Sequence, residues 1–226
     1  MGIVVNTNVS SLIVQRSLGS ATGSMSKSLE RLSTGYRINR AADDAAGLTI
    51  SEALKAQARG AAVASSNAQA GVNLLQTAEG DLGIIQDNLQ RIRDLAVQAA
   101  NGTNATSERD AIKSEVEQRV SEITRLASSS SFNAIKLLDG TQTAVALQIG
   151  PNFNSSAVSL NSLTIGTPLG KADATTLGIN GAGTDSVASY FATSTKAASY
   201  ITRIDAAIST ISSRRSTIGS LQNRLE

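Results

Sequence analysis

A serine and a lysine three residues apart form the first pair in this chain that could carry out chemistry. Ser24 and Lys27 fit the S-x-x-K spacing, in which the lysine assists a nucleophilic serine in penicillin-recognising enzymes. Those enzymes also need S-D-N and K-T-G elements, and the sequence contains neither. We therefore interpret the pair as part of a solvated helix face in a stretch rich in alanine and serine.

Two other groups of residues could bind ligands. Gly178, Gly181 and Gly183 could cradle a phosphate, but their spacing fits neither G-x-G-x-x-G nor the P-loop, so we favour a flexible loop. The adjacent Asp43 and Asp44 could bind a cation, but a hard cation needs several oxygen ligands from a shaped loop. Carboxylates that stabilise the start of a helix explain them better. We expect no metal site and no cofactor.

The charged residues of the middle region raise the question of nucleic-acid binding. Basic and acidic side chains alternate there: Arg91, Arg93, Arg109, Arg119 and Arg125 with Asp87, Asp94, Glu108, Glu115, Glu117 and Glu122. No aromatic residues are interleaved to stack on bases. The pattern predicts a helix surface with ion pairs and no nucleic-acid partner.

The composition excludes much of the remaining chemistry. The 226 residues include no Cys and no His, which excludes disulfides and cysteine nucleophiles and removes the commonest general base. We therefore expect that the protein is not an enzyme. Hydrophobic residues make up 41% but aromatic residues only 3%, which favours closely packed helices around an aliphatic, alanine-rich core. No run approaches the ~18 apolar residues of a membrane span, so we expect no membrane insertion.

Apolar residues at heptad spacing predict the helices that form this core. One row is Leu75, Leu82, Leu89 and Ala96, and its neighbour is Ala78, Ile85, Ile92 and Ala99. Together they form an a/d seam of more than three heptads, which is typical of a coiled coil or a bundle helix. A further helix is predicted over residues 107–127, where Ser107 and Asp110 resemble a capping box at its start.

The C-terminal stretch repeats the seam but ends in polar residues. One row is Ala197, Ile204, Ile211, Ile218 and Leu225, and the other runs through Ile201, Ile208, Arg215 and Gln222. We expect a further partner to cover this half-polar end.

At the other end of the chain, Gly19 and Gly23 each cost about 1 kcal/mol in a helix interior. We therefore expect residues 1–35 to become ordered only when they pack on something else.

Residues 140–183 follow a different period. Val145, Leu147 and Ile149 alternate with polar residues, as do Val158 and Leu160, with Gly150-Pro151-Asn152 between the two stretches. This pattern predicts a β-hairpin, and the Gly-, Thr- and Ala-rich residues 164–184 predict a surface loop. The expected fold class is mainly α: a long antiparallel helical bundle or coiled coil with a small β-hairpin insert. These features indicate an assembly protein.

Several motifs, in order along the chain, resemble those of bacterial flagellin, the subunit of the flagellar filament. The N-terminal matches are Asn6-Thr7-Asn8-Val9, Leu32-Ser33-Thr34-Gly35-Tyr36-Arg37-Ile38-Asn39 and Asp43-Asp44-Ala45-Ala46-Gly47. The later ones are Gln90-Arg91-Ile92-Arg93-Asp94-Leu95-Ala96-Val97-Gln98, Phe132-Asn133, Lys136-Leu137-Leu138-Asp139-Gly140 and Leu221-Gln222-Asn223-Arg224-Leu225-Glu226. One departure is Ala134, which stands where flagellins typically have a glycine.

The resemblance implies a structural subunit that self-assembles through its terminal helices for swimming motility. Residues 1–40 would be the N-terminal inner-tube segment, helical only when packed and otherwise disordered. Residues 41–226 would be the helical bundle layer, with a β-hairpin and loop at about 140–185. Export by the flagellar type III apparatus would place the protein in the extracellular flagellum. Its implied partners are further copies of itself, an export chaperone and a capping protein.

The resemblance also assigns roles to particular residues. The signature residues implied in assembly are Arg37, Asn39, Asp43, Asp44 and Gly47. A Toll-like receptor recognises many flagellins at a patch that corresponds here to Arg91, Leu95 and Glu115. Arginine and leucine one turn apart, with a glutamate on the antiparallel neighbour, make a credible contact centre. The alternative is that the three are ordinary filament-interface and surface residues.

Two further expectations follow from the same resemblance. Flagellins continue beyond the match that ends at Glu226, so we expect this chain to lack the usual C-terminal inner-tube helix. The alternatives to a filament subunit are a hook–filament junction protein of the same apparatus, or a ligand of an innate immune receptor as its main role.

Overall fold

The computed structural model describes residues 8–142, 144–152, 161–180 and 186–226. The chain divides into two compact units, an N-terminal unit, Met1–Ala58, and a bundle unit, Arg59–Glu226. The boundary falls within the long helix α2, Ala45–Ala100. The N-terminal unit also contains α1, Val9–Thr34.

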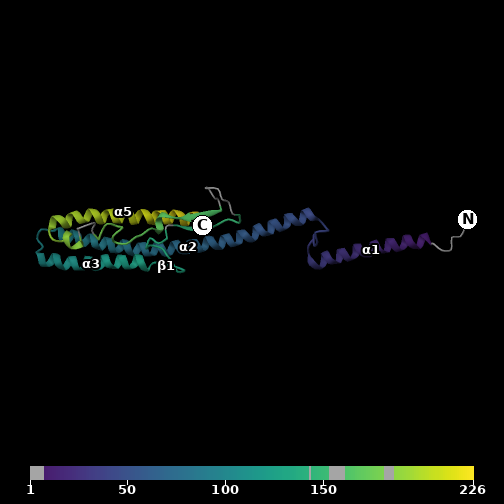
Figure 1. Cartoon of the computed structure of the whole chain (residues 1–226), viewed down its shortest axis with the longest axis horizontal. Helices are drawn as coiled ribbons and strands as arrows, with labels where there is room; N and C mark the ends of the chain where they lie inside the picture. Colours follow the sequence, from purple (N-terminus) through teal and green to yellow (C-terminus); the bar gives the residue numbers. More distant parts are fainter. Residues whose placement is uncertain (1–7, 143, 153–160, 181–185) are drawn as a thin grey trace. The chain divides into compact units, whose positions relative to one another are not determined.

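The bundle unit is built from three long helices. The second half of α2 is followed by α3, Thr106–Ser129, and the last helix is α5, Ser194–Leu225. The three helices run side by side (Figure 1). Contacts of α2 with α5 run from Arg93–Asp205 at one end to Glu79–Gln222 at the other, so these two helices are antiparallel. The predicted mainly α bundle is confirmed.

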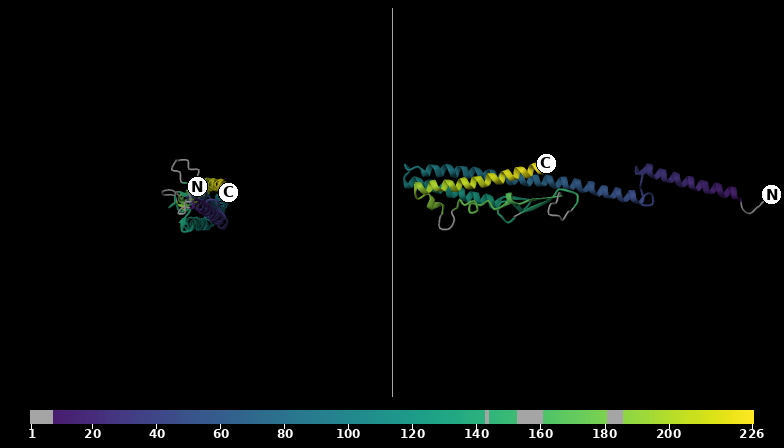
Figure 2. Two further views of the ribbon diagram at one scale, coloured as in Figure 1. Left: turned by 90° about the vertical axis from the view of Figure 1, so that its right-hand side faces the viewer. Right: turned by 90° about the horizontal axis from the view of Figure 1, so that it is seen from above.

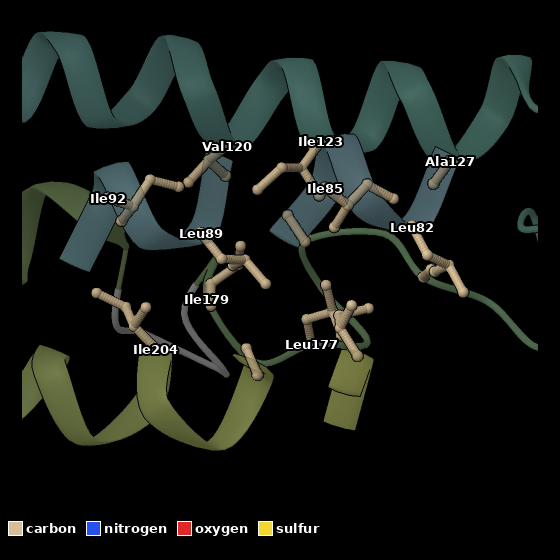
Figure 3. Packing of buried hydrophobic residues seen from close by; sticks show 14 of the residues in the cluster. Leu82, Ile85, Leu89, Ile92, Val120, Ile123, Ala127, Leu177, Ile179 and Ile204 are labelled. Carbon is tan, nitrogen blue, oxygen red and sulfur yellow. The ribbon is translucent and has the colours of Figure 1, made fainter. Parts of the chain in front are cut away.

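The predicted seam of α2 forms the centre of the core. All eight of its positions are fully buried: Leu75, Ala78, Leu82, Ile85, Leu89, Ile92, Ala96 and Ala99. On the covering helices, Val116 and Ile123 of α3 and Ile204 and Ile211 of α5 are also fully buried. Figure 3 shows side chains of α2, α3 and α5 converging on this core. Burial of each large aliphatic side chain contributes roughly 1.5–3 kcal/mol, so the seam stabilises the whole unit.

The polar end of the C-terminal seam, for which a further partner was expected, finds polar partners within the chain. Arg215 donates to Gln86 Oε1 at 2.7 Å and pairs with Glu79 at 3.7 Å. Gln222 donates to the same glutamate at 3.2 Å. The polar positions of α5 therefore meet polar positions of α2 inside this chain, a match that reading one helix by itself does not reveal.

The start of α3 also differs from expectation. Instead of a box formed by Ser107 and Asp110, the carboxylate of Glu108 accepts a hydrogen bond from the backbone N–H of Ala105 at 2.5 Å. The helix begins one residue earlier, at Thr106, so the glutamate occupies the third helical position. A side chain there reaches the otherwise unpaired N–H at the helix start, which a residue two positions later does not.

The β-hairpin consists of β3, Val145–Gln148, and β4, Ser162–Ile165, which pair antiparallel. The expected second strand at Val158 and Leu160 lies outside the described residues. The green segment that carries the hairpin lies along one side of the helices (Figure 2). Gly71 of α2 makes this approach possible, because a Cβ atom there would collide with Leu147. Asn67 of α2 also donates to the Gln148 carbonyl oxygen at 3.1 Å.

The prediction of a surface loop over residues 164–184 is wrong for its described part. The first two residues belong to β4, and a 3-10 turn, Thr167–Leu169, follows. The segment contributes several buried side chains to the core: Ile165, Leu169, Ala172, Ala174, Leu177 and Ile179. These residues follow no helical or strand period, so their burial leaves no pattern in the sequence.

Arginines and aromatic residues of the C-terminal region hold this segment in place. Arg203 donates to the Gly178 carbonyl oxygen at 3.0 Å, and Arg214 donates to that of Gly170 at 2.7 Å. The Tyr200 hydroxyl donates to the Ile179 carbonyl oxygen at 2.7 Å. Its ring stacks on that of Tyr190, in the short helix α4, Val187–Tyr190, at a centroid distance of 5.0 Å. Burial raises the pKa of Tyr200, so this donor stays protonated at neutral pH.

A strained two-residue turn joins β1, Ser131–Phe132, to β2, Ile135–Lys136. Asn133 and Ala134 both have positive φ, 48° and 64°. Two positive φ angles in a two-residue hairpin are the geometry of a type I′ turn, which favours Asn-Gly. Ala134 therefore adopts a left-handed conformation that costs an alanine roughly 1–2 kcal/mol.

We expect Ala134→Gly to stabilise the bundle unit by about 1 kcal/mol, because glycine adopts this conformation without steric cost. Urea unfolding of the full chain, followed by circular dichroism, measures the change. The control is Ala146→Gly on the exposed face of β3, where φ is not positive and a loss of roughly 0.5–1 kcal/mol is expected. A lower unfolding midpoint for Ala134→Gly would contradict the strain.

Candidate functional site

The signature residues lie in the N-terminal unit: Arg37, Asn39, Asp43 and Asp44 in the loop between α1 and α2, and Gly47 in the first turn of α2. We call residues 35–44 the signature loop. Asp43 is its central group: one carboxylate oxygen lies 2.5 Å from Lys27 Nζ on α1, and the other accepts from the backbone N–H groups of Asn39 and Arg40 at 3.4 Å. The Lys27 ammonium and these two N–H donors hold the pKa of Asp43 below its ordinary value.

Glu30 of α1 forms a second connection to the signature loop. Its Oε1 atom accepts from Asn39 Nδ2 at 2.8 Å and from Arg40 Nε at 3.0 Å. Together with the Lys27–Asp43 pair, this contact joins the last turns of α1 to the signature loop. We call Lys27, Glu30, Asn39, Arg40 and Asp43 the clasp. Since Lys27 is committed to Asp43, the S-x-x-K pair with Ser24 forms no catalytic arrangement in the described structure.

Asp44 and Gly47 act at the start of α2. Asp44 directly precedes Ala45, the first residue of α2, and its carboxylate accepts from the backbone N–H of Gly47 at 2.8 Å. Asp44 therefore has the helix-start role that was expected of both acidic residues, whereas Asp43 binds Lys27 and the signature loop instead. A Cβ atom on Gly47 would collide with the Asp44 carboxylate and with the Ile38 side chain, so the glycine leaves room for the contact at the helix start. Arg37 is exposed in the same loop.

The structure brings Arg91 and Glu115 together on the surface of the bundle unit. Arg91 Nε lies 3.2 Å from Glu115 Oε1, and Arg119 Nε lies 3.1 Å from the same oxygen. Arg119 also donates to Asn88 Oδ1 at 3.3 Å. These contacts join α2 to α3, and the Arg119 and Arg91 guanidinium groups hold the pKa of Glu115 below its ordinary value.

Leu95 is one turn along α2 from Arg91, but it faces the core. Only 3% of it is exposed, whereas the Arg91 side chain is 51% exposed. The structure therefore places two of the three expected receptor-binding residues at the surface and the third beneath it. The role of this patch stays a prediction.

Sequence reasoning missed the groups that hold both sites. Lys27, Glu30 and Arg40 belong to the clasp, and Asn88 and Arg119 to the α2–α3 contact. For Arg119 a signal exists, since it follows Glu115 by four residues on one helix. The partners from other elements carry no such signal, because their sequence separation from the sites follows no helical period.

Other candidate chemistry receives no support. Within the described ranges, no group of three or more metal-binding side chains occurs. No helix in the part of the chain that the structure describes is long and apolar enough to cross a membrane. Of the candidate phosphate loop, only Gly178 is described, and its φ of 72° makes it a turn residue. Most of the charged side chains of α3 form the expected ion pairs, such as Arg125–Glu122 at 2.5 Å.

The arrangement matches a known family. The bacterial flagellin N-terminal helical region matches residues 5–143. A flagellin of Halalkalibacterium halodurans is 40% identical over 224 residues, covering 99% of this chain and 78% of that relative. The chain belongs to the bacterial flagellin family. This is a family of structural proteins, the subunits of the flagellar filament.

Further relatives agree with this family. Flagellin C of Vibrio cholerae is 48% identical over 161 residues, which cover 71% of this chain but 42% of that relative. A flagellin of Xenorhabdus nematophila is 44% identical, and the chain spans 52% of its length. The crystal structure of Bacillus cereus flagellin is 32% identical and has a TM-score of 0.57. The match covers 71% of this chain and 85% of that chain.

We expect the Asp43 carboxyl to titrate below 3.8, its ordinary value, and to return towards that value in Lys27→Gln. Because the folded pKa is depressed, the clasp stabilises the N-terminal unit above the ordinary pKa. That contribution is lost as the pH falls through the folded pKa. NMR titration of the full chain measures the shift. Lys113→Gln, in the bundle unit, is the control and should leave the Asp43 titration unchanged.

Proposed function

We propose that the N-terminal unit supplies the contacts that build this chain into a flagellar filament. The supporting observation is the exposure of apolar side chains along α1, which has no buried residue. Leu18, Met25 and Leu32 recur at seven-residue spacing and are 65%, 64% and 82% exposed. An apolar row this exposed is typical of a surface that another chain covers.

The clasp leaves that row open. Leu18 and Lys27 are nine positions apart, which places them on opposite sides of α1. The signature loop therefore holds α1 by the side away from the apolar row. We infer that residues 1–40 form the inner-tube segment, held by the signature loop, and that residues 41–226 act as the bundle layer.

By the same proposal the protein is exported by the flagellar type III apparatus, with a chaperone and a capping protein as partners, and works outside the cell.

We expect the triple variant Leu18→Ser, Met25→Ser, Leu32→Ser to abolish filament formation, because it removes the apolar contact surface of α1. The full-length gene is expressed in a flagellin-deficient strain, and filaments are counted by electron microscopy. The bundle unit should keep its unfolding midpoint, since α1 lies outside it.

The matched control is Arg16→Ser, on the opposite side of α1, which should leave filament number and length unchanged. Normal filaments from the triple variant would contradict the proposal. Immunogold labelling of the wild type separates a filament subunit, which labels the whole filament, from a junction protein, which labels only the end at the hook.

We also infer that the surface formed by Arg91 and Glu115 is recognised by a Toll-like receptor. The observation that favours this second role is the exposure of the pair where α2 and α3 meet. Arginine in a rigid setting is a frequent contact residue in protein interfaces. Leu95 would contribute from below, by keeping this part of α2 in the core.

We expect Arg91→Ala with Glu115→Ala to weaken receptor activation by about tenfold or more, because contact residues of this kind contribute 1 kcal/mol or more. Reporter cells that carry the receptor measure the response to the full chain. The control is Arg93→Ala with Asp205→Ala, which removes another exposed ion pair of α2, at 2.7 Å. Both variants should lose at most about 1 kcal/mol of stability.

Leu95→Ala does not test the contact, because a leucine this buried should cost about 2–5 kcal/mol of stability. Equal receptor responses from the two paired variants would contradict the role of the patch.

A further inference from the structure

The turn between α2 and α3 combines a fixed base with an exposed Asn-Gly tip. At the base, Asn104 Nδ2 donates to the Gln98 carbonyl oxygen at 2.6 Å, and Arg109 donates to the Asn104 carbonyl oxygen at 2.5 Å. Asn101 and Gly102 form the tip, where both residues are exposed. The Asn104 N–H donates to the Asn101 carbonyl oxygen at 3.2 Å and closes the turn.

The surroundings of the tip favour attack of a backbone nitrogen on a side-chain amide. Asn101 Oδ1 accepts from the Thr103 N–H at 3.2 Å, and this contact polarises the amide carbonyl. Gly102 has no Cβ to hinder approach, and the space where one would lie is empty to 4 Å. Within the described residues, its N–H makes no hydrogen bond that would have to break first.

We propose that Asn101 is a site of spontaneous deamidation. The Gly102 nitrogen loses its proton and forms a bond to Asn101 Cγ, the Cγ–Nδ2 bond breaks, and ammonia leaves. One water molecule then opens the cyclic imide at either carbonyl. The products are an aspartyl or an isoaspartyl residue at position 101, with no oxidant or reductant required. Asparagine is a thermolabile residue, and a following glycine offers the least steric resistance.

The reaction changes a defined part of the bundle unit. The new carboxylate follows the last residue of α2, Ala100, where the helix dipole disfavours negative charge. It lowers the formal net charge of the chain from +2 to +1. The isoaspartyl product also lengthens the main chain inside a turn whose base is fixed. The fraction of subunits that carry this additional negative charge would thus increase with age.

Two other asparagines of the same protein serve as internal comparisons. Asn104 precedes Ala105, and its amide nitrogen is already engaged by Gln98. Asn133 precedes Ala134, and the methyl group of that alanine hinders the same attack. Trypsin places Asn101 and Asn104 in one peptide, residues 94–109, so their conversion is compared in a single fragment.

The experiment incubates the folded full chain at mildly alkaline pH and follows tryptic peptides by mass spectrometry. We expect Asn101 to convert roughly tenfold faster than Asn104 or Asn133. We expect Gly102→Ala to slow conversion of Asn101 to a similar extent. The empty space at this position makes the substitution structurally neutral, which an unchanged unfolding midpoint verifies. Asn101→Asp provides the reference position of the product in isoelectric focusing.

Three results would overturn the proposal. Asn101 could convert no faster than Asn104, Gly102→Ala could convert at the wild-type rate, or conversion could occur only in urea, which would mean that the folded turn protects the amide. These results leave the filament proposal untouched, because filament formation is measured on α1.

Discussion

Burial of the α2 seam is the interaction on which the rest of the bundle unit depends. The positions from Leu75 to Ala99 are fully buried because they are covered from several sides by α3, α5 and the segment that ends at Ile179. None of these three elements could bury the seam by itself. Alanines such as Ala78 and Ala96 keep the neighbouring backbones close, which explains why a chain with 3% aromatic residues can fill its core.

The irregular segment in this core depends on donors from α5. A buried carbonyl oxygen without a hydrogen bond is costly. Turns within the segment pair some of its carbonyl oxygens, such as those of Asp173 and Ala174, and those of Gly170, Gly178 and Ile179 accept from side chains instead. Arg203, Arg214 and Tyr200 are these donors, and each of these residues reaches across from the helix that already covers the seam. The same helix therefore buries apolar surface and satisfies the backbone of the segment beside it.

The N-terminal unit uses the opposite arrangement. Its polar groups are paired within the unit, through Lys27, Asp43 and Glu30, while its apolar row is exposed. In the bundle unit an apolar heptad row meets its cover within the chain. In α1 the same kind of row stays exposed among the described residues, and this contrast is the physical basis for the proposal that the N-terminal unit mediates assembly.

The sequence by itself determined the long helices and their buried faces, because a heptad period reports which side of a helix must leave water. It also indicated the family, through long motifs in order along the chain. Only the tertiary structure decided that Arg215 and Gln222 find polar partners on α2, that Leu177 and Ile179 are core residues, and that Leu95 is buried beside an exposed Arg91. The reason is that burial and pairing of these residues depend on which distant segment packs against them, and irregular segments carry no period from which that contact could be read.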